Sequence, residues 1–452
     1  MKILKYILIA LPILLIGIAV FYLGPRLPVI TGFAAKNMCS CVYLGERDAA
    51  NVAKEELGSG LLALANTTVN EAEKTVTSTV YGFGKQVAIY REGLGCTLVA
   101  DGSLEDLRKQ IFAKADAALS YDPDTLLFPY GNQMVDTFPE GIDQQKLNAF
   151  LDVQFDKGEE IELGTRGLLV VYKGQIIAEQ YGKGYDKDKR QLGWSMAKSV
   201  TNAMFGLRVA DGKLAINTTP DIPEWEADER KNIKNDDLLK MSSGLDWGEI
   251  YTDLSDATLM LYKKGDMHTF ACGAEVADSP GRTWYYSSGT SNILSGLIHN
   301  TFDDQNEYWN YPYQRLFSKI NMSSAIFEPD VAGTFVGSSY VWATPRDWAR
   351  FGLLYMYDGI WNNERILPSG WVGYSTMDAS GSKGGYGAQI WLNKGGEFPD
   401  APLNMFYFRG YQGQRVFVLP DQEMVVVRLG IKGDNEYFNE VLKGILQICM
   451  PI

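Results

Sequence analysis

The chain has 452 residues, a formal net charge of −13 at pH 7 and only two histidines. This length predicts two or three domains, and 46% hydrophobic with 21% charged residues is the usual balance of a globular protein with a large core. Because acidic side chains outnumber basic ones, no extended basic surface is available to neutralise phosphates, which excludes nucleic acid as an expected partner.

Residues 1–24 are expected to form a membrane anchor. Two lysines precede the run Tyr6–Leu23, which holds no charged residue and is long enough to cross most of a bilayer core. The basic flank predicts that the N-terminus stays in the cytoplasm and that the rest of the chain is exported, to a bacterial periplasm or cell surface. An anchor is favoured over a cleaved signal peptide because no small-x-small cleavage site follows promptly; the pair Ala34-Ala35 is the late alternative.

Residues 36–120 predict a small separate α+β region whose role no motif indicates. A helix is expected over Ala49–Leu64. Strands are expected at Thr75–Val80 and Gln86–Tyr90, where polar and apolar side chains alternate. Glycines on both sides of a phenylalanine, at Gly82-Phe83-Gly84, predict the turn that joins them.

Three of the five cysteines lie in this small region. In an exported protein a disulfide between Cys96 and either Cys39 or Cys41 is expected, with free, buried thiols as the alternative. Two cysteines separated by one residue are too close for a structural zinc site, and no histidine is nearby. No metal or other cofactor is expected here or elsewhere in the chain.

A linker rich in Asp, Pro and Gly near 120–132 leads to the large region, residues 135–452. A long irregular stretch at 213–280 is expected to wall a binding site. Strands at both ends with helices between them predict an α/β sandwich whose sheet combines N-terminal and C-terminal pieces. The expected elements are a helix at 143–155, a hairpin of strands 166–172 and 175–181, helices at 291–300 and 344–357, strands 415–419 and 423–429, and a helix at 435–448.

Ser195 and Lys198 form a Ser-x-x-Lys motif at the beginning of an expected helix that ends near Asp211-Gly212. Three residues are just under one helical turn, so the Lys198 amine is expected on the same face as the Ser195 hydroxyl. A serine hydroxyl is a poor nucleophile until a base takes its proton, and a lysine in a partly dry pocket can have its pKa lowered enough to help. The motif predicts nucleophilic catalysis, although the tetrapeptide alone also fits a helix with a surface lysine.

Further motifs follow in order: Met241-Ser242-Ser243-Gly244-Leu245, then Tyr286-Ser287-Ser288, then Gly410-Tyr411 before the C-terminal strands. With Ser-x-x-Lys, this ordered set resembles the serine β-lactamases and penicillin-recognising hydrolases. The resemblance is to the class C branch, in particular the 6-aminohexanoate-dimer hydrolases and family esterases. It covers residues 135–452 and implies a β-lactamase-like sandwich of an antiparallel sheet and helices.

The resemblance implies a role for each motif residue. Ser195 would be the acylated nucleophile, and Lys198 and Tyr286 would act together as general base and acid. Such a set suits acyl transfer, in which a serine attacks a carbonyl carbon and a shared base moves the proton.

The same resemblance implies how the substrate would be held. Ser288 takes the place of the Asn or Ser that orients the substrate in the family. The backbone N–H groups of Ser195 and of Tyr411, which follows Gly410, would form the oxyanion hole that stabilises developing negative charge.

Phe408 is the clear departure from the family pattern. The β-lactamases offer a Lys, or in some relatives a His, at the position that aligns with Phe408, and this cation meets the substrate carboxylate. Phe408 cannot do so, although Arg409 or Arg415 could. We therefore expect a small ester or linear amide as the substrate, rather than a β-lactam, in a pocket walled by residues that include Trp247 and Tyr251.

Three alternatives remain open on this fold: a D-alanyl-D-alanine-type peptidase, a β-lactamase, and a non-catalytic binding protein. The intact Ser195, Lys198 and Tyr286 argue against the last of these. An α/β-hydrolase is not favoured, because the sequence has no Gly-x-Ser-x-Gly motif. A zinc hydrolase is excluded because His268 and His299 do not stand at ligand spacing.

Overall fold

The computed structural model describes residues 17, 19–115, 123–135, 137–158 and 160–450, and the chain divides into two compact units. The small unit comprises the chain up to Ile111, Trp247–Met267 and Asp330–Ala332; the large unit comprises Phe112–Asp246, His268–Pro329 and Gly333–Ile452. The small unit therefore includes part of the 213–280 stretch that the sequence places in the large region.

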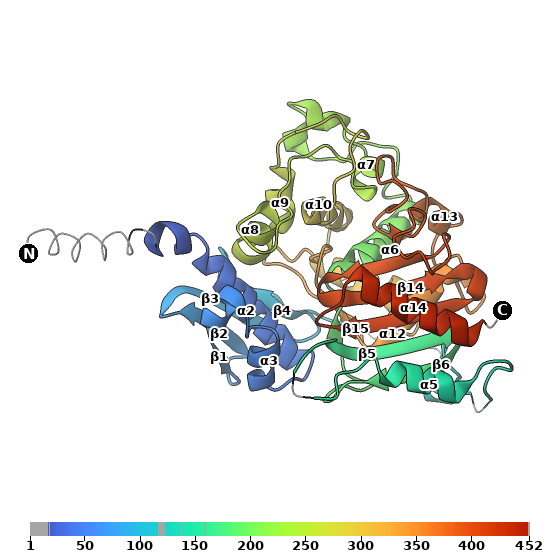
Figure 1. Cartoon of the computed structure of the whole chain (residues 1–452). Helices are drawn as coiled ribbons and strands as arrows, with labels where there is room; N and C mark the ends of the chain where they lie inside the picture. The colour runs from blue at the N-terminus through green and yellow to red at the C-terminus, as the bar shows by residue number, and fades with distance from the viewer. Residues whose placement is uncertain (1–16, 18, 116–122, 136, 159, 451–452) are drawn as a thin grey trace, which may run out of the picture. The chain divides into compact units, whose positions relative to one another are not determined.

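In the small unit a long helix packs on a four-stranded antiparallel sheet of order β1-β2-β3-β4 (Figure 1). The helix, α2 (Leu27–Tyr43), also packs against α8 (Asp256–Lys263). Gly32 permits this close approach, because a Cβ there would lie 2.8 Å from the Tyr262 carbonyl oxygen. The other elements are α3 (Ala49–Glu55), β1 (Asn66–Asn70), β2 (Thr75–Val80), β3 (Phe83–Arg91), β4 (Gly95–Leu98) and α4 (Leu104–Lys109).

Helix α3 is shorter than the sequence predicts. The expected helix over Ala49–Leu64 ends at Glu55, because the chain turns so tightly at Gly58 that a Cβ would lie 2.3 Å from the Lys54 carbonyl oxygen. A separate 3-10 turn, η2 (Gly60–Leu64), takes up the rest of the segment. The expectation of one continuous helix is therefore wrong.

The β2–β3 hairpin turns one residue earlier than predicted. Its two-residue turn is Tyr81-Gly82, and β3 begins at Phe83. Both turn residues have positive φ, 49° for Tyr81 and 84° for Gly82, as two-residue hairpin turns require. The turn lies beside the first part of α2, where the Thr31 hydroxyl donates a hydrogen bond to the Gly84 carbonyl.

A disulfide joins Cys39 of α2 to Cys96 of β4, with their Cα atoms 6.0 Å apart. The expected cross-link is therefore present, and Cys39 is the partner. Cys41 remains a buried thiol near the Arg47 guanidinium, 3.5 Å away. A cross-link between residues 57 apart constrains the unfolded chain and contributes about 4 kcal/mol to stability. Among the described residues no group of His, Cys, Asp and Glu side chains could hold a metal ion.

Six strands form one antiparallel sheet in the large unit, in the order β12-β13-β14-β15-β5-β6. The N-terminal hairpin turns at Lys173-Gly174 as predicted, and its first strand pairs with the last strand of the chain, which sets Val170 opposite Val426. The sheet thus combines N-terminal and C-terminal pieces, which confirms the expectation. The strands are β5 (Thr165–Tyr172), β6 (Gln175–Tyr181), β12 (Trp391–Leu392), β13 (Phe406–Gly410), β14 (Gln414–Leu419) and β15 (Met424–Gly430).

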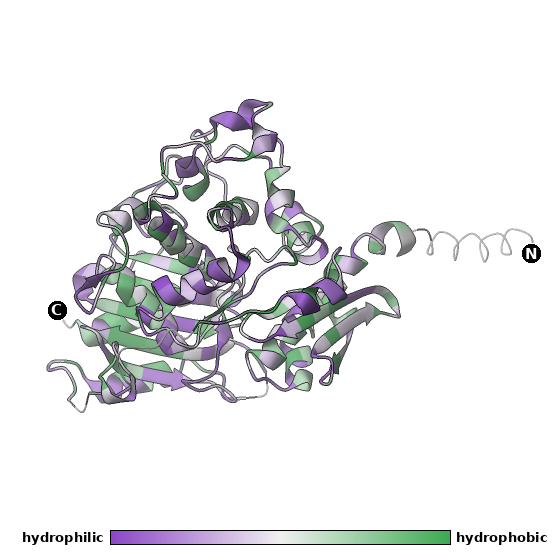
Figure 2. Cartoon of the chain, turned by 180° about the vertical axis from the view of Figure 1, so that it is seen from behind, coloured by the Kyte–Doolittle hydropathy of each residue, from purple (hydrophilic) through white to green (hydrophobic). Residues whose placement is uncertain are grey.

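Helices cover both faces of this sheet, giving a mixed α/β sandwich (Figure 1). On β14, Phe417 faces the helices α5 (Gln144–Asp152) and α14 (Asn435–Cys449), whereas Val416 faces α12 (Pro345–Met356). The strands carry long hydrophobic stretches (Figure 2), because both of their faces are covered. Each fully buried aliphatic side chain of this kind contributes about 2 kcal/mol.

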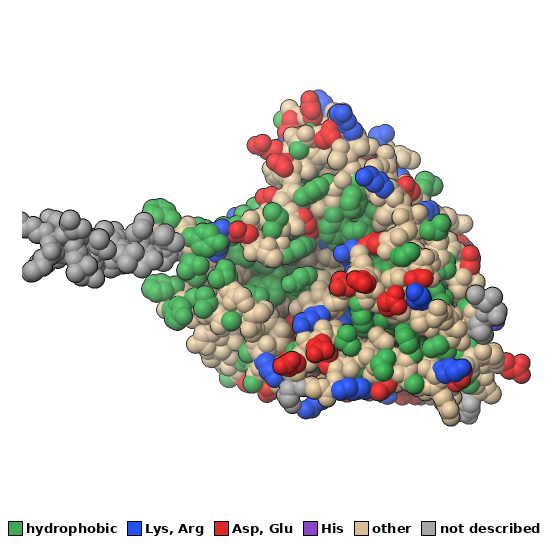
Figure 3. All heavy atoms as spheres, in the orientation of Figure 1, with side chains coloured by type: hydrophobic (Ala, Val, Ile, Leu, Met, Phe, Trp, Pro, Cys, Tyr) green, Lys and Arg blue, Asp and Glu red, His purple; other side chains and the backbone are tan. Residues whose placement is uncertain are grey.

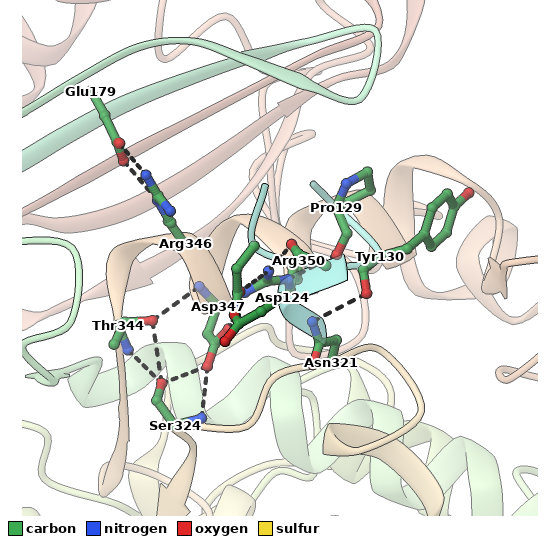
Figure 4. Close-up of polar contacts among 12 residues, drawn as sticks. Asp124, Pro129, Tyr130, Glu179, Asn321, Ser324, Thr344, Arg346, Asp347 and Arg350 are labelled. Carbon is green, nitrogen blue, oxygen red and sulfur yellow. Dashed lines mark hydrogen bonds and ion pairs between the residues drawn. The ribbon is translucent and has the colours of Figure 1, made fainter. Parts of the chain in front are cut away.

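Arg350 of α12 ties the segment before α5 to the helix (Figure 4). Its guanidinium donates to the carbonyl oxygens of Pro129 at 2.9 Å and Gly131 at 2.6 Å, and pairs with Asp347 at 2.6 Å. Both side chains of this ion pair are buried, so removing either one would leave the charge of the other uncompensated. On the same helix, Arg346 forms a salt bridge with Glu179 of β6.

Within the described part of the chain, no helix is long and apolar enough to cross a membrane. The run Tyr6–Leu23 lies mostly outside the described residues, so the expected anchor stays a prediction.

Shorter elements complete the large unit and carry the candidate site. The elements are β7 (Gln191–Leu192), η4 (Trp194–Met196), α6 (Ala197–Ala210), α7 (Asn235–Leu239), α9 (Met267–Cys272, in this unit from its second residue), α10 (Ser288–His299), α11 (Gln305–Pro312), β8 (Ile326–Phe327), β9 (Val341–Ala343), β10 (Ile360–Trp361), β11 (Glu364–Arg365) and α13 (Trp371–Ser375).

Candidate active site

Ser195 lies in a strained turn between β7 and α6. The residue before it, Trp194, has φ 49°, a left-handed conformation that a bulky side chain rarely adopts. Gly193 begins the turn, and a Cβ there would lie 2.3 Å from the Trp348 ring, so the turn passes very close to that ring. The turn, η4, holds Ser195 partly exposed at the beginning of α6.

Lys198 lies at the centre of the site, and its side chain is 1% exposed. Its Nζ contacts three oxygens: the hydroxyl of Ser195 at 3.4 Å, the hydroxyl of Ser288 at 3.0 Å and the carbonyl of Ser338 at 3.0 Å. The same nitrogen lies 4.9 Å from the centre of the Tyr286 ring. The structure therefore brings Ser195, Tyr286 and Ser288 together around the buried nitrogen of Lys198.

Helix α10 begins at this point and supplies two layers of contacts. Ser287 is the capping residue, which leaves Ser288 as the first helical residue with its hydroxyl at Lys198. One turn later, Asn292 donates to the Ser338 hydroxyl at 3.1 Å and accepts from the Ser338 backbone N–H at 3.2 Å. Asn292 therefore positions the backbone carbonyl that Lys198 contacts.

An aromatic wall, Trp284, Tyr286, Tyr386 and Trp391, continues from the catalytic tyrosine candidate. The Tyr286 ring lies 5.3 Å from Trp391 and 6.0 Å from Tyr386, and Trp284 packs on both of these neighbours. Most of these pairs are tilted or edge-to-face, the arrangement that aromatic quadrupoles favour. The site is thus bounded beyond Tyr286 by broad apolar ring surface.

The end of β13 is held against the Ser195 turn. A Cβ on Gly410 would lie 2.1 Å from the Gly193 carbonyl oxygen, so the two backbones touch only because this position is glycine. The Trp194 indole N–H donates to the Gln412 side-chain oxygen at 3.0 Å, and the Tyr411 ring meets the Trp194 ring edge-on at 5.5 Å. The predicted oxyanion residues therefore lie on two adjoining, mutually braced segments.

Phe408 does not face this site. It is fully buried between Phe351 and Tyr355 of α12, at ring distances of 4.9 and 5.3 Å. A lysine at this position would therefore be placed in an aromatic core and would not meet a substrate. The expectation that Phe408 marks the position of a substrate-facing cation is wrong, because the side chain points to the opposite side of the strand from Arg409 and Tyr407.

The two nearby arginines are also engaged within the fold. Arg409 lies 4.8 Å from the centre of the Trp391 ring and pairs with Glu397 at 3.2 Å. Arg415 is buried and donates to the Gly410 carbonyl at 3.2 Å. Burial, and then the charge of Arg409, lower the pKa of Arg415 to about 9. Arg415 thus supports the β13 backbone and is not available to a substrate.

Trp247 and Tyr251, the expected pocket walls, belong to the small unit. The Trp247 indole N–H donates to Glu249 at 2.6 Å, and the Tyr251 hydroxyl donates to the same carboxylate. Their part in a substrate pocket stays a prediction.

The sequence patterns did not indicate several residues that the structure places at the site. Asn292 stands four residues after Ser288 and so on the same helical face, a spacing that could have revealed it. Ser338, Tyr386 and Trp391 come from distant loops and short strands, where no local pattern indicates a place in the site.

Comparison with known proteins places residues 158–443, more than half of the chain, in the family model described as Beta-lactamase. A 6-aminohexanoate-dimer hydrolase from Paenarthrobacter ureafaciens is 22% identical over 316 residues, which are 63% of this chain and 78% of that protein.

Solved structures share the fold. One, from Bacillus anthracis and described as a proposed 6-aminohexanoate-dimer hydrolase, superposes with a TM-score of 0.56 at 20% identity, over 73% of this chain and 89% of its own. Another, EstCE1, described as a hydrolase with promiscuous acyltransferase activity, gives a TM-score of 0.52 at 14% identity, over 68% of this chain and 99% of its own.

Proposed function

The chain belongs to the β-lactamase family and is a serine hydrolase, and we propose that it cleaves a small ester or linear amide through an acyl-enzyme on Ser195. One observation carries the proposal. The buried Lys198 nitrogen lies between the Ser195 hydroxyl, at 3.4 Å, and the Ser288 hydroxyl, at 3.0 Å, beside the Tyr286 ring. A nucleophile beside a basic side chain that is itself oriented is what covalent acyl transfer needs.

The reaction proceeds in two acyl-transfer steps. Ser195 Oγ forms a bond to the acyl carbon, and its proton passes to the Lys198–Tyr286 pair. The pair returns this proton to the leaving alcohol or amine as the original acyl bond breaks. Water then attacks the acyl-enzyme by the same route, which releases the acid and restores the Ser195 hydroxyl.

The oxyanion that forms in each step is stabilised by backbone N–H groups of Ser195 and Tyr411. Ser195 lies in the first turn of a helical segment, where N–H groups have no partner within the helix. The close approach of Gly410 to Gly193 supports a position for Tyr411 beside the same carbonyl oxygen. A single donor of this kind lowers the barrier by about 3 kcal/mol.

The aromatic wall favours an apolar, uncharged acyl group. Trp391 and Tyr286 offer ring surface beside the nucleophile, and the nearby Arg409 already pairs with Glu397 at 3.2 Å. A substrate carboxylate would have to displace that pair. We therefore propose short-chain esters first and linear amides second, which accords with the hydrolase names of two similar proteins.

A substrate panel tests this proposal. Aryl esters of short acids should be turned over well, linear amides more slowly, and penicillins, cephalosporins and D-alanyl-D-alanine peptides negligibly. A phosphonate probe should add to Ser195 and to no other residue, as peptide mass mapping would show. Efficient cephalosporin or D-alanyl-D-alanine cleavage would instead establish a β-lactamase or a peptidase, and absence of labelling would point to a binding protein.

We further propose that Tyr6–Leu23 anchors the chain in a membrane, with the hydrolase outside the cytoplasm. The Cys39–Cys96 disulfide supports an oxidising compartment. Ala34 and Ala35, the late cleavage candidate, are fully buried in α2, so cutting there would remove part of a packed helix. Cell fractionation should release the full chain only with detergent, and a mature N-terminus near Ala35 would contradict the proposal.

A further inference from the structure

We propose that the β2–β3 hairpin tip, with Tyr81 and Phe83, and the neighbouring Phe21 and Tyr22 rest in the interfacial layer of a lipid bilayer and hold the small unit on the membrane surface. These four side chains form the aromatic patch. The inference rests on the proposed membrane anchor. It gives the small unit, to which no motif assigns a role, a surface and a partner.

The aromatic patch contains the three most exposed aromatic side chains among the described residues. Phe21 is 85% exposed, Tyr81 82%, Phe83 70% and Tyr22 51%. Large aromatic side chains normally contribute their area to a core or an interface. Several such side chains gathered in one place mark a surface that contacts something else.

Contacts within the small unit bring the patch together at the N-terminal end of α2. The Thr31 hydroxyl donates to the Gly84 carbonyl, and a Cβ on Gly84 would lie 2.7 Å from Leu27, so the hairpin runs against the first turn of the helix. Arg26 donates to the Tyr22 carbonyl at 2.7 Å and lies 3.8 Å from the Tyr22 ring. Figure 3 shows hydrophobic side chains gathered on this end of the small unit.

The backbone conformation at the hairpin tip supports the same inference. Tyr81 has φ 49° in a two-residue turn, a position that normally belongs to Asn, Asp or Gly. Lys173 has nearly the same angle, φ 48°, in the β5–β6 hairpin, so the turn itself does not require an aromatic ring. Because the ring is exposed, the contact that it serves lies outside the hairpin.

The sequence identifies that contact as lipid. The patch residues Phe21 and Tyr22 are themselves the end of the uncharged run Tyr6–Leu23, so a bilayer that holds the run also reaches the patch. Tyrosine is enriched at the headgroup level, where its apolar ring and its polar hydroxyl are both satisfied, and phenylalanine is typical of the apolar face of interfacial segments. A second membrane contact beside the anchor would fix the small unit against rotation about a single helix.

Photo-cross-linking in vesicles tests the patch. The full chain carries benzoylphenylalanine in place of Phe83 and is reconstituted in phosphatidylethanolamine–phosphatidylglycerol vesicles. The matched control carries the same side chain in place of Val153, which is 62% exposed and lies in the large unit. After irradiation, mass spectrometry should find lipid adducts on the peptide containing residue 83 at least tenfold more often than on the control peptide. An unchanged urea transition of the small unit checks that the variant at residue 83 is folded, and unchanged ester hydrolysis checks the control variant at residue 153.

The outcomes separate this inference from the anchor. A chain that floats with the vesicles but gives no excess adduct at residue 83 overturns the patch and leaves the anchor standing. Cross-links from residue 83 to a second copy of the chain also overturn it, because the patch would then be a protein interface. A chain that does not float with the vesicles overturns both the anchor and the patch.

Discussion

Trp194 in the large unit and Tyr81 in the small unit have the same backbone conformation, φ 49°, which bulky residues rarely adopt. Their surroundings differ. Trp194 is buried, and its indole is fixed by Gln412 and by the Tyr411 ring. Tyr81 is an exposed ring at a hairpin tip. The packed Trp194 fixes the backbone beside Ser195, whereas the exposed Tyr81 ring is left available to a contact beyond the fold.

Removing the nucleophile should have the largest effect and tests the packed side of this comparison. Ser195→Ala should lower kcat for ester hydrolysis about a millionfold, because no acyl-enzyme can form. The melting temperature should stay within about 2 °C of wild type, since the strained turn and its packing remain. Equal activity in this variant would show that the turn serves something other than Ser195.

Removing either member of the Lys198–Tyr286 pair should have the second-largest effect. Lys198→Ala and Tyr286→Phe should each lower kcat by about a thousandfold, and the double variant should be little worse than either, because the two side chains act as a unit. Tyr386→Phe is the matched control, since it removes a hydroxyl from the aromatic wall beside the pair and should retain most activity. Fully additive losses would contradict a shared proton path.

Opening the disulfide tests the small unit by itself. The Cys39→Ser, Cys96→Ser double variant should lose about 4 kcal/mol of unfolding free energy, seen as an earlier urea transition of the small unit. Ester hydrolysis in the large unit should stay unchanged at room temperature. The control is wild type treated with a mild reductant, which should reproduce the shift if the bond is accessible; no shift in the double variant would refute the cross-link's structural role.

Removing the hydrogen bond between the Trp194 indole and the Gln412 side chain should have a moderate effect. Gln412→Leu removes the acceptor of the Trp194 indole N–H and should lower kcat/KM about tenfold, the size expected for a misplaced oxyanion contact. Trp194→Phe should cost a similar amount, and the double variant should cost no more, because both break one hydrogen bond. Independent losses in this cycle would mean that the bond does not position Ser195.

The smallest predicted effect lies at the exposed tip. Tyr81→Asn creates the Asn-Gly sequence that such turns favour and should raise the unfolding free energy by about 1 kcal/mol, measured by urea denaturation. The same replacement at Trp194 should lower activity, because there the strained residue is packed against the site. A destabilised Tyr81→Asn variant would show that the ring is held by the fold itself.

The predictable parts of the molecule were those with local patterns. The hairpin at Lys173-Gly174 and the C-terminal helix α14 have nearly the bounds that the sequence predicts. Turn residues and hydrophobic periodicity can be recognised from consecutive residues alone. The Ser195–Lys198 pairing followed from helical spacing alone. Tyr286 and Ser288 depended on a family resemblance, since nothing local ties them to a site far along the chain.

The remaining parts depended on contacts between distant segments. The direction of Phe408 could not be seen without the strand register, which places it opposite Val416 and toward α12. The association of α8 with the small unit likewise comes from packing against α2, for which neither segment carries a pattern. Trp391 reaches Tyr286 through a strand of two residues, too short for any alternation to appear.

The pairing of β5 with β15 has a consequence for biosynthesis. The central strand neighbours in this sheet, exemplified by Val170 and Val426, are joined by most of the large unit's length, so the sheet cannot close until the last strand has left the ribosome. While synthesis continues, β5 and its hairpin expose apolar edges and faces that have no native partner. Closure of the sheet beside the candidate site is therefore a late event in synthesis, and chaperone protection of the growing chain matters most between the synthesis of β5 and that of β15.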